Sequence, residues 1–412
     1  MRDVEEPRVL LEEALMNRAF CIVWLAGCGA ATGPSQPDAH VAMVTSVDVT
    51  PSTKILKRGL DAPTQLIAIA TLDDGRTADV TASATWESSA AAVVKVDGGL
   101  ISPVGFGSAT ITATYEGQRD SAMITSTSPR VYMTNTGVTP TILVFDAFAT
   151  GDIPPLQKIV LPTSAPSSFP WAIQVVEDEI YLSDPTRRTV SVWPITANGA
   201  VAPTRVIPGT ATTKLNGNYG LVVANHEIYT VGASTTSQPE IVVFPATANG
   251  DVAPTREIVG DVTLLGNDIE TLAVYMNELY VVNTSAQQIL VFPLTASGNV
   301  APTRTLTLPV SPYDVKFADG EMYIADLTGI RVYLATASGM DNPIRYIVGP
   351  DTGLTNVIGV SIVGHELFSV NYTGTGGLHV HSRSATSDAV PLRNIPSGGM
   401  TTISSPRYQD VY

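Results

Sequence analysis

The first residue whose type and position suggest covalent chemistry is Cys28. It follows Gly27 and an apolar run of eight residues, 19–26, which begins directly after Arg18. A helix that spans a bilayer needs about 20 apolar residues, so this run fits the apolar region of an export signal better than a membrane span. Small residues beside a cleavable bond, next to a thiol that can be alkylated, are what lipid attachment requires.

The residues Leu25, Ala26, Gly27 and Cys28 resemble the lipobox of bacterial lipoproteins. The resemblance implies that residues 1–27 are a signal peptide and that Cys28 carries the lipid that anchors the exported chain in the cell envelope. The residue after the cysteine is Gly29 and not aspartate, which favours the outer membrane or the cell surface as the destination. The alternative is a chance apolar patch that contains a buried cysteine.

The segments on either side of the lipobox also carry expectations. Residues 1–15 include five acidic side chains and fit a leader poorly, so we predict that translation starts at Met16. Residues 28–42 are rich in Gly, Ala, Pro and Ser, a composition typical of a flexible tether.

After Cys28 the sequence shows no motif that is diagnostic of catalysis. It has no further cysteine, no Gly-x-Ser-x-Gly motif and no phosphate-binding glycine loop. His379 and His381 alternate along an expected strand and could chelate a metal, but without a third ligand we expect a surface pair. We therefore predict no metal, no cofactor and, in preference, no enzymatic activity. The alternative is a carboxylate pair that the fold brings together from distant positions.

The composition favours strands joined by turns, and it argues against two classes of partner. Charged residues make up 15% of the chain, and Gly and Pro together account for 62 residues (33 and 29). The net charge of −15 comes without a basic cluster, which disfavours nucleic acid and anionic membrane surfaces as partners. We predict an all-β monomer.

Residues 43–128 contain short strands with period-two alternation, separated by turns, and predict a β-sandwich. They resemble bacterial Ig-like domains of the second group, through the motifs Val49-Thr50-Pro51, Asp74-Gly75, Asp79-Val80-Thr81, Thr85-Trp86 and Gly107-Ser108-Ala109-Thr110-Ile111. The resemblance implies a spacer or adhesion module with Trp86 in its core. For Asp73, Asp74 and Asp97, calcium binding is an alternative to the solvated turns that we expect.

Residues 129–412 contain six copies of one unit of about 47 residues. Each copy has an apolar strand that ends in a bulky ring, and His381 holds this ring position in the sixth copy. We expect the Phe, Trp and Tyr rings of the other five copies to pack between sheets: Phe145, Trp193, Phe244, Phe292 and Tyr333. Five copies carry an arginine after a proline-containing turn: Arg205, Arg256, Arg304, Arg345 and Arg393. We expect these arginines to bond carboxylates or carbonyls between neighbouring units, and the alternative is an anion-binding ring.

The repeats resemble NHL and YVTN-type β-propellers, and residues 132–135 (Tyr-Met-Thr-Asn) are close to the YVTN signature. The resemblance implies a six-bladed propeller, since a unit of four strands is one blade. The first copy lacks the strand before Tyr132, whereas residues 405–412 resemble residues 311–315 of a later copy. We therefore predict that the C-terminal strand completes the first blade and leaves no open edge.

Candidate ligand-binding residues are polar side chains at the ends of strands, together with residues that break the repeat. The strand-end residues Asp184, Asn283, Asp326 and Asn371 are expected to cap turns, and the alternative is that they line a ligand or metal site. Together with Arg187 and Arg188, which follow Asp184 and break the repeat, they form the candidate rim. Trp171 and Tyr372 also depart from the repeat. We expect a membrane-anchored lipoprotein that displays its propeller to a protein or glycan ligand. The alternative is a propeller enzyme, a lyase or hydrolase on glycan or lactone substrates at the channel mouth.

Overall fold

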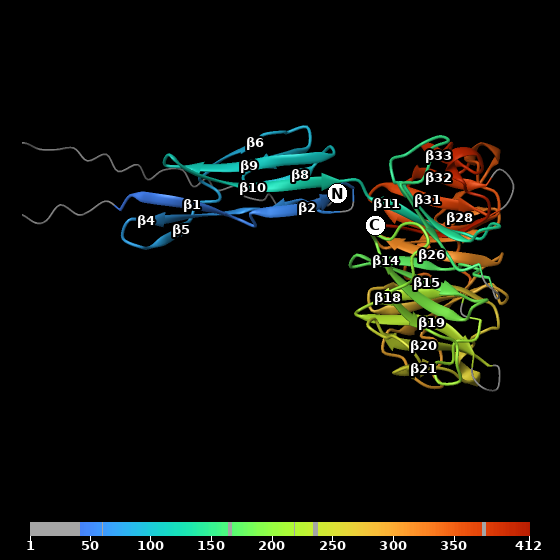
Figure 1. Cartoon of the computed structure of the whole chain (residues 1–412). Coiled ribbons are helices and arrows are strands. Elements are labelled where there is room, and N and C mark those ends of the chain that lie inside the picture. The colour runs from blue at the N-terminus through green and yellow to red at the C-terminus, as the bar shows by residue number, and fades with distance from the viewer. Residues whose placement is uncertain (1–41, 60, 164–166, 218, 234–237, 373–375) are drawn as a thin grey trace, which may run out of the picture. The chain divides into compact units, whose positions relative to one another are not determined.

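The computed structural model describes residues 42–59, 61–163, 167–217, 219–233, 238–372 and 376–412 (Figure 1). The chain divides into two units, Met1–Met43 and Val44–Tyr412, and the second holds every described strand. The predicted signal peptide, the lipobox and all but the end of the tether lie outside the described residues. No helix in the described ranges is long and apolar enough to cross a membrane.

The part from Val44 to Thr127 consists of three small sheets around one core. Its strands are β1 (Val44–Thr50), β2 (Thr53–Lys57), β3 (Thr64–Gln65), β4 (Ile67–Leu72), β5 (Thr77–Asp79), β6 (Thr85–Ser88), β7 (Val94–Asp97), β8 (Leu100–Pro103), β9 (Gly107–Tyr115) and β10 (Gln118–Thr127). The strand orders are β1-β4-β5, β2-β10-β9-β6 and β3-β8-β7. The alternation seen in the sequence places Ile111 and Ile124 in the core.

Trp86 was expected in the core of this part, and Asp74 was expected in a solvated turn. Trp86 is half-buried against the core, and its Nε1 donates to the Thr81 carbonyl at 2.9 Å. Asp74 accepts the backbone N–H of Arg76 at 3.0 Å, as expected of a turn carboxylate. Within the described ranges, no three His, Cys, Asp or Glu side chains come together to hold a metal.

From Arg130 onward the chain forms six four-stranded antiparallel sheets. The first sheet contains β34 (Pro406–Val411), β11 (Arg130–Asn135), β12 (Thr141–Asp146) and β13 (Gln157–Val160), and the second contains β14 (Ile173–Val176), β15 (Glu179–Asp184), β16 (Thr189–Pro194) and β17 (Arg205–Ile207). The third sheet contains β18 (Leu221–Ala224), β19 (Glu227–Ala233), β20 (Pro239–Pro245) and β21 (Arg256–Ile258), and the fourth contains β22 (Ile269–Tyr275), β23 (Glu278–Asn283), β24 (Gln288–Pro293) and β25 (Arg304–Thr307). The fifth sheet contains β26 (Pro312–Ala318), β27 (Glu321–Asp326), β28 (Gly329–Leu334) and β29 (Arg345–Ile347), and the sixth contains β30 (Val357–Val363), β31 (Glu366–Asn371), β32 (Gly377–Ser382) and β33 (Arg393–Pro396). Three short 3-10 helices are η1 (Asp261–Thr263), η2 (Pro350–Thr352) and η3 (Gly399–Thr401).

The C-terminal strand β34 is the fourth strand of the first sheet. It pairs antiparallel with β11, with Val411 opposite Val131 and Gln409 opposite Met133, and the C-terminus lies beside β11 in Figure 1. The first strand of each sheet contacts the first strand of the next, and β34 contacts both β30 and β14. The contacts between these six inner strands therefore form a cycle.

Polar side chains satisfy the open edges of several inner strands. Asp410 Oδ2 accepts the Val175 N–H at 2.8 Å, Gln174 Oε1 accepts the Val223 N–H at 2.6 Å, and Asp314 Oδ2 accepts the Val360 N–H at 2.9 Å. An inner strand has a sheet partner on one side only, so its outer N–H groups would otherwise lack acceptors. Each of these side chains joins one sheet to the next.

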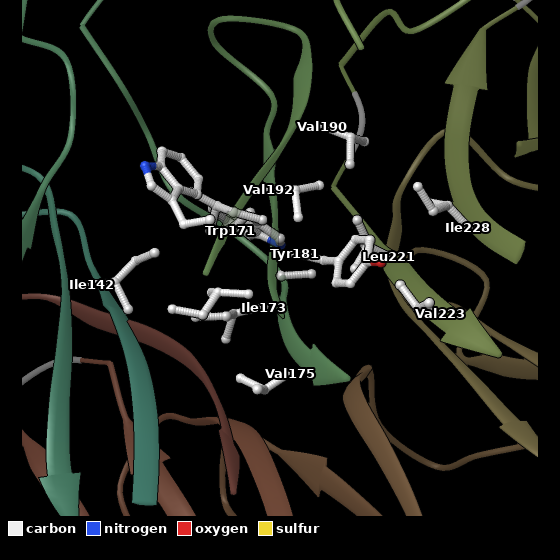
Figure 2. Packing of buried hydrophobic residues seen from close by; sticks show 14 of the residues in the cluster. Ile142, Trp171, Ile173, Val175, Tyr181, Val190, Val192, Leu221, Val223 and Ile228 are labelled. Carbon is white, nitrogen blue, oxygen red and sulfur yellow. The ribbon is translucent and has the colours of Figure 1, made fainter. Parts of the chain in front are cut away.

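The repeated apolar residues fill the spaces between sheets. Figure 2 shows Ile173, Val175 and Tyr181 of the second sheet packed with Leu221 and Val223 of the third. The six repeated rings are all buried, with exposed fractions of 3% or less. The predicted packing of the five Phe, Trp and Tyr rings between sheets is confirmed, and each of these five rings contributes on the order of 2–3 kcal/mol of burial free energy.

The repeated arginines join neighbouring sheets, although their carboxylate partner lies in their own sheet. Arg256 Nη1 bonds Glu227 Oε1 at 2.6 Å, and its Nη2 donates to the Leu294 carbonyl of the following sheet at 3.1 Å. The other four copies repeat this pair of contacts: Arg205 with Glu179 and Ala246, Arg304 with Glu278 and Ala335, Arg345 with Glu321 and Arg383, and Arg393 with Glu366 and Ala147.

The first sheet uses the same positions with the hydrogen-bond polarity reversed. Arg130 stands where the other sheets have glutamate, and Gln157 stands where they have arginine. Arg130 Nη1 donates to Gln157 Oε1 at 2.9 Å, while Gln157 Nε2 donates to the Ile195 carbonyl of the second sheet at 3.1 Å. The contact between sheets is kept although the repeat motif is lost.

Candidate functional site

The four Asp and Asn side chains of the predicted rim are buried and engaged by their own loops. Asp184 accepts backbone N–H groups of Phe169 and Arg187 at 3.2 and 3.0 Å. Asn283 donates to the Leu264 carbonyl at 3.0 Å. Each of the four is 3% exposed or less, so they stabilise turns and present little to a ligand.

The other two of these side chains are held in the same way. Asp326 accepts the N–H groups of Thr328 and Gly329 at 2.7 and 3.0 Å and pairs with Arg331 at 2.8 Å. Asn371 donates to the Gly353 carbonyl at 2.7 Å. The structure does not bring the four together, because each ends the second strand of a different sheet.

Arg187 and Arg188 lie in the loop after β15. Arg187 is half-buried, whereas Arg188 is exposed and has a left-handed backbone conformation, with φ at 56°. Neither residue lines a described pocket, although their loop neighbours Pro185 and Thr186 do. Their predicted role in a ligand rim stays a prediction.

The strongest candidate site is a pocket of about 300 Å³ where the inner strands begin, which we call the Arg407 pocket. It is lined by Phe169, Trp171, Pro185, Thr186, Tyr219 and Arg407. Trp171 lies just before β14, Tyr219 just before β18, and Arg407 on β34. Trp171 meets Tyr219 edge-on, with ring centroids 5.0 Å apart, and stacks on Phe169 at 5.5 Å. The walls are therefore aromatic and come from separate sheets.

Arg407 is the charged group of this pocket. Its guanidinium carbon lies 3.7 Å from the Tyr372 ring centroid, 4.6 Å from that of Trp171 and 5.0 Å from that of Phe169. Nη2 donates to the Tyr372 hydroxyl at 2.7 Å. Among the described residues, no carboxylate lies within salt-bridge distance of Arg407, and its buried Nε has no acceptor. Burial lowers the pKa of this guanidinium from its ordinary value.

A buried carboxyl group lies behind the pocket and closes the centre of the inner strands. Glu270 on β22 accepts hydrogen bonds at Oε2 from Trp171 Nε1 and from the Tyr408 hydroxyl, each at 3.1 Å. Tyr408 lies on β34, three steps from β22 in either direction around the cycle of inner strands, so this bond crosses its centre. Burial, and secondarily the charge of Asp268, raises the pKa of Glu270 to about 7. Burial also raises the pKa of Tyr408, so its hydroxyl remains a donor.

A second pocket, of about 200 Å³, contains residues from all six inner strands. Its polar lining includes Gln174, Lys316, Ser361 and Asp410, and its aromatic wall is Tyr275 stacked on Phe317 with centroids 4.7 Å apart. Asp410 and Gln174 already bond neighbouring inner strands through their side chains. This pocket is smaller than the Arg407 pocket, and part of its polar lining is engaged in the fold.

The two histidines that could have bound a metal are buried, which corrects their expected place on the surface. His379 is 8% exposed and His381 is 0% exposed. His381 Nε2 bonds the Thr352 carbonyl at 3.0 Å. Burial, together with the neighbouring His381, lowers the pKa of His379 to about 4, so it is neutral at pH 7. His381 occupies the ring position of the sixth copy, and this position is buried in every sheet.

The departures from the repeat identified part of the site. Trp171 and Tyr372 were singled out by the sequence, and the structure brings both against Arg407. Arg407, Glu270 and Tyr219 were missed. Arg407 lies within the segment predicted to complete the first sheet, and no role of its own was predicted for it. Its aromatic neighbours become apparent only when the sheets are assembled.

No protein-family model matches the chain, and no curated protein is similar to it in sequence. Among solved structures, it is similar to a chain of the nidogen/laminin complex (11% identity, TM-score 0.48, 69% of this chain and 98% of that one). It is also similar to a functionally unknown protein from Desulfotomaculum acetoxidans (10%, 0.46, 69% and 99%) and to the WD40 β-propeller domain of Doa1 (11%, 0.36, 55% and 72%). Similarity at this level says nothing about ligands.

Proposed function

We propose that this protein is an exported, lipid-anchored binding protein of the cell envelope. In this proposal residues 129–412 are a six-bladed β-propeller closed by the C-terminal strand, and residues 43–128 are an Ig-like spacer that holds it away from the membrane. The lipobox at Cys28, the six four-stranded sheets and the cycle of inner-strand contacts support this organisation.

The observation that carries the binding function is the composition of the Arg407 pocket. Three aromatic rings and one guanidinium line it, and of its described lining residues none is an acid or a histidine. Behind it, Glu270 bonds Trp171 and Tyr408 across the centre of the inner strands, and these side chains form the floor of the pocket. Concave aromatic walls with one fixed polar group are typical of ligand recognition.

The binding function predicts that ligands are lost when the aromatic wall is removed. We expect Tyr219→Ser to weaken, by roughly 10-fold or more, the binding of any compound that binds wild type in a panel of neutral and acidic monosaccharides and small aromatic compounds. Binding is measured by ligand-observed NMR on the purified full-length protein. Tyr275→Ser, in the second pocket, is the matched control and should bind as wild type does. A panel without a binder, or binding lost only in Tyr275→Ser, would contradict the proposal.

The second candidate function, an enzyme on glycan or lactone substrates, is favoured by one observation. Glu270 has a pKa raised to about 7, which is the range of a general acid or base at neutral pH. Trp171 stands between this carboxyl group and the pocket, because Glu270 accepts its indole N–H and does not itself line the cavity. Turnover of a bound panel compound, abolished in Glu270→Gln while binding persists, would favour the enzyme.

The lipid anchor predicts a simple change in partitioning. We expect wild type to incorporate labelled palmitate in a bacterial host and to enter the detergent phase of Triton X-114, whereas Cys28→Ser does neither, because serine lacks the thiol that forms the thioether. Cys21→Ser, which alters the other cysteine, is the control and should behave as wild type does. Labelling that persists in Cys28→Ser would overturn the proposed anchor.

A further inference from the structure

Arg407 retains hydrogen-bond donors that the fold does not use. Its Nε is buried and has no acceptor in the part of the chain that the structure describes, as is also true of Arg205, Arg256 and Arg345. The Nη2 of Arg407 donates to Tyr372, and its Nη1 has no acceptor among the described residues. By contrast, each of the five repeated arginines bonds a glutamate of its own sheet. A guanidinium presents its donors as a planar fork that matches the two oxygens of a carboxylate. Arg407 therefore has a positive charge and an Nη1 donor that no carboxylate of the described residues engages.

The residues around Arg407 could hold a ligand in which a ring carries the hydrogen-bond acceptor. Phe169, Trp171 and Tyr219 present aromatic surface in the same pocket, whose volume of about 300 Å³ holds one six-membered ring with its substituents. Pro185 adds a further apolar surface, and the Thr186 hydroxyl can donate or accept. An aromatic wall can pack against the face of an aromatic ring or against the apolar C–H groups on one face of a saturated ring.

We infer that the Arg407 pocket binds a carboxylate carried on a six-membered ring, with the carboxylate on the Arg407 guanidinium and the ring against Trp171 and Tyr219. This inference rests on the proposed binding function and specifies its ligand class. The chain as a whole carries a charge of −15, which repels anions, so affinity for an acid depends on this local cation. The ring comes from one of two sources, an aromatic acid or an acidic sugar.

The test compares acids with their uncharged counterparts. Benzoate and D-glucuronate are titrated against the full-length protein by ligand-observed NMR, with benzamide and D-glucose as neutral analogues. We expect at least one acid to bind more tightly than its analogue and to bind more weakly at higher salt. Arg407→Gln should lower the affinity for that acid by roughly 10- to 100-fold. The affinity of Arg407→Lys should lie between those of wild type and Arg407→Gln, because lysine keeps the positive charge but lacks the planar pair of donors.

A control variant and the neutral analogues distinguish failure of this ligand class from failure of the proposed binding function. Lys316→Gln removes a positive charge in the second pocket and should leave the affinity for the acid unchanged. If the neutral analogues bind as tightly as the acids and Tyr219→Ser abolishes both, the binding function stands and the ligand class is wrong. If an acid binds equally to wild type and Arg407→Gln, or if neither acid binds, the inference fails. The melting temperature of each variant shows whether it is folded, and Arg407→Lys remains informative if Arg407→Gln does not fold.

Discussion

Removal of residues 405–412 is expected to abolish cooperative folding of the six sheets that residues 130–412 form, which we call the six-sheet ring, or to lower its melting temperature by more than about 15 °C. The deletion removes β34, whose Tyr408 and Gln409 are 3% and 1% exposed and whose backbone pairs with β11. Loss of one buried aromatic side chain costs about 3–5 kcal/mol, against a total stability of about 5–15 kcal/mol for a typical domain. The deletion also leaves β11 with an unpaired edge and removes the inner-strand contacts to β30 and β14.

Thermal unfolding followed by circular dichroism measures this effect. The matched control is removal of Tyr412 alone, which leaves the pairs of Met133 with Gln409 and Val131 with Val411 in place and should cost only a few degrees. Addition of a synthetic peptide of residues 405–412 to the truncated protein is expected to raise its melting temperature, because a ligand that binds only the folded state stabilises it. A truncated protein with an unchanged melting temperature would show that the ring does not depend on β34.

The repeat allowed much of the fold to be predicted, because each position in the unit has one physical role. The ring position is buried in all six sheets, and this holds even for His381, whose residue type alone suggested the surface. Arg130 and Gln157 show that a position can keep its physical role when its residue type changes. A hydrogen bond between sheets is kept where the motif that predicts it is absent.

The site at the centre could not be predicted from the repeat, since it depends on residues that differ between sheets. Trp171 and Glu270 are 99 positions apart, and Glu270 and Tyr408 are 138 positions apart. Trp171 departs from the repeat, but Glu270 and Tyr408 look unremarkable in their own copies. Only the order of the inner strands places β22 opposite β34, and sequence patterning within one sheet carries no information on which side chains meet across a centre.

The pH dependence of stability is the second large effect, and it follows from the burial of Glu270. We expect Glu270→Gln to be more stable than wild type at pH 8, by up to about 3 kcal/mol, relative to their difference at pH 4. Glu270 is 9% exposed, and burial raises the pKa of its carboxyl group from 4.5 to about 7. At pH 4 the group is protonated in both the folded and the unfolded state. Between about 4.5 and 7 it ionises in the unfolded state only, so wild type loses stability as the pH rises, and the loss levels off above about 7.

Glutamine isolates this contribution because it keeps an acceptor oxygen for the Trp171 indole and the Tyr408 hydroxyl but cannot ionise. Urea unfolding at pH 2, 4, 6 and 8 gives the difference in the free energy of unfolding between variant and wild type, in which the other titrating groups cancel. Glu321→Gln is a control of opposite sign: its hydrogen bond with Arg345 lowers the pKa of Glu321 to about 2, so wild type gains stability relative to that variant as the pH rises from 2 to 5. A Glu270→Gln difference that is constant from pH 4 to pH 8 would mean that this carboxyl group is ionised in the folded protein at neutral pH. The floor of the Arg407 pocket would then carry a negative charge beside the arginine, and a bound carboxylate would be repelled.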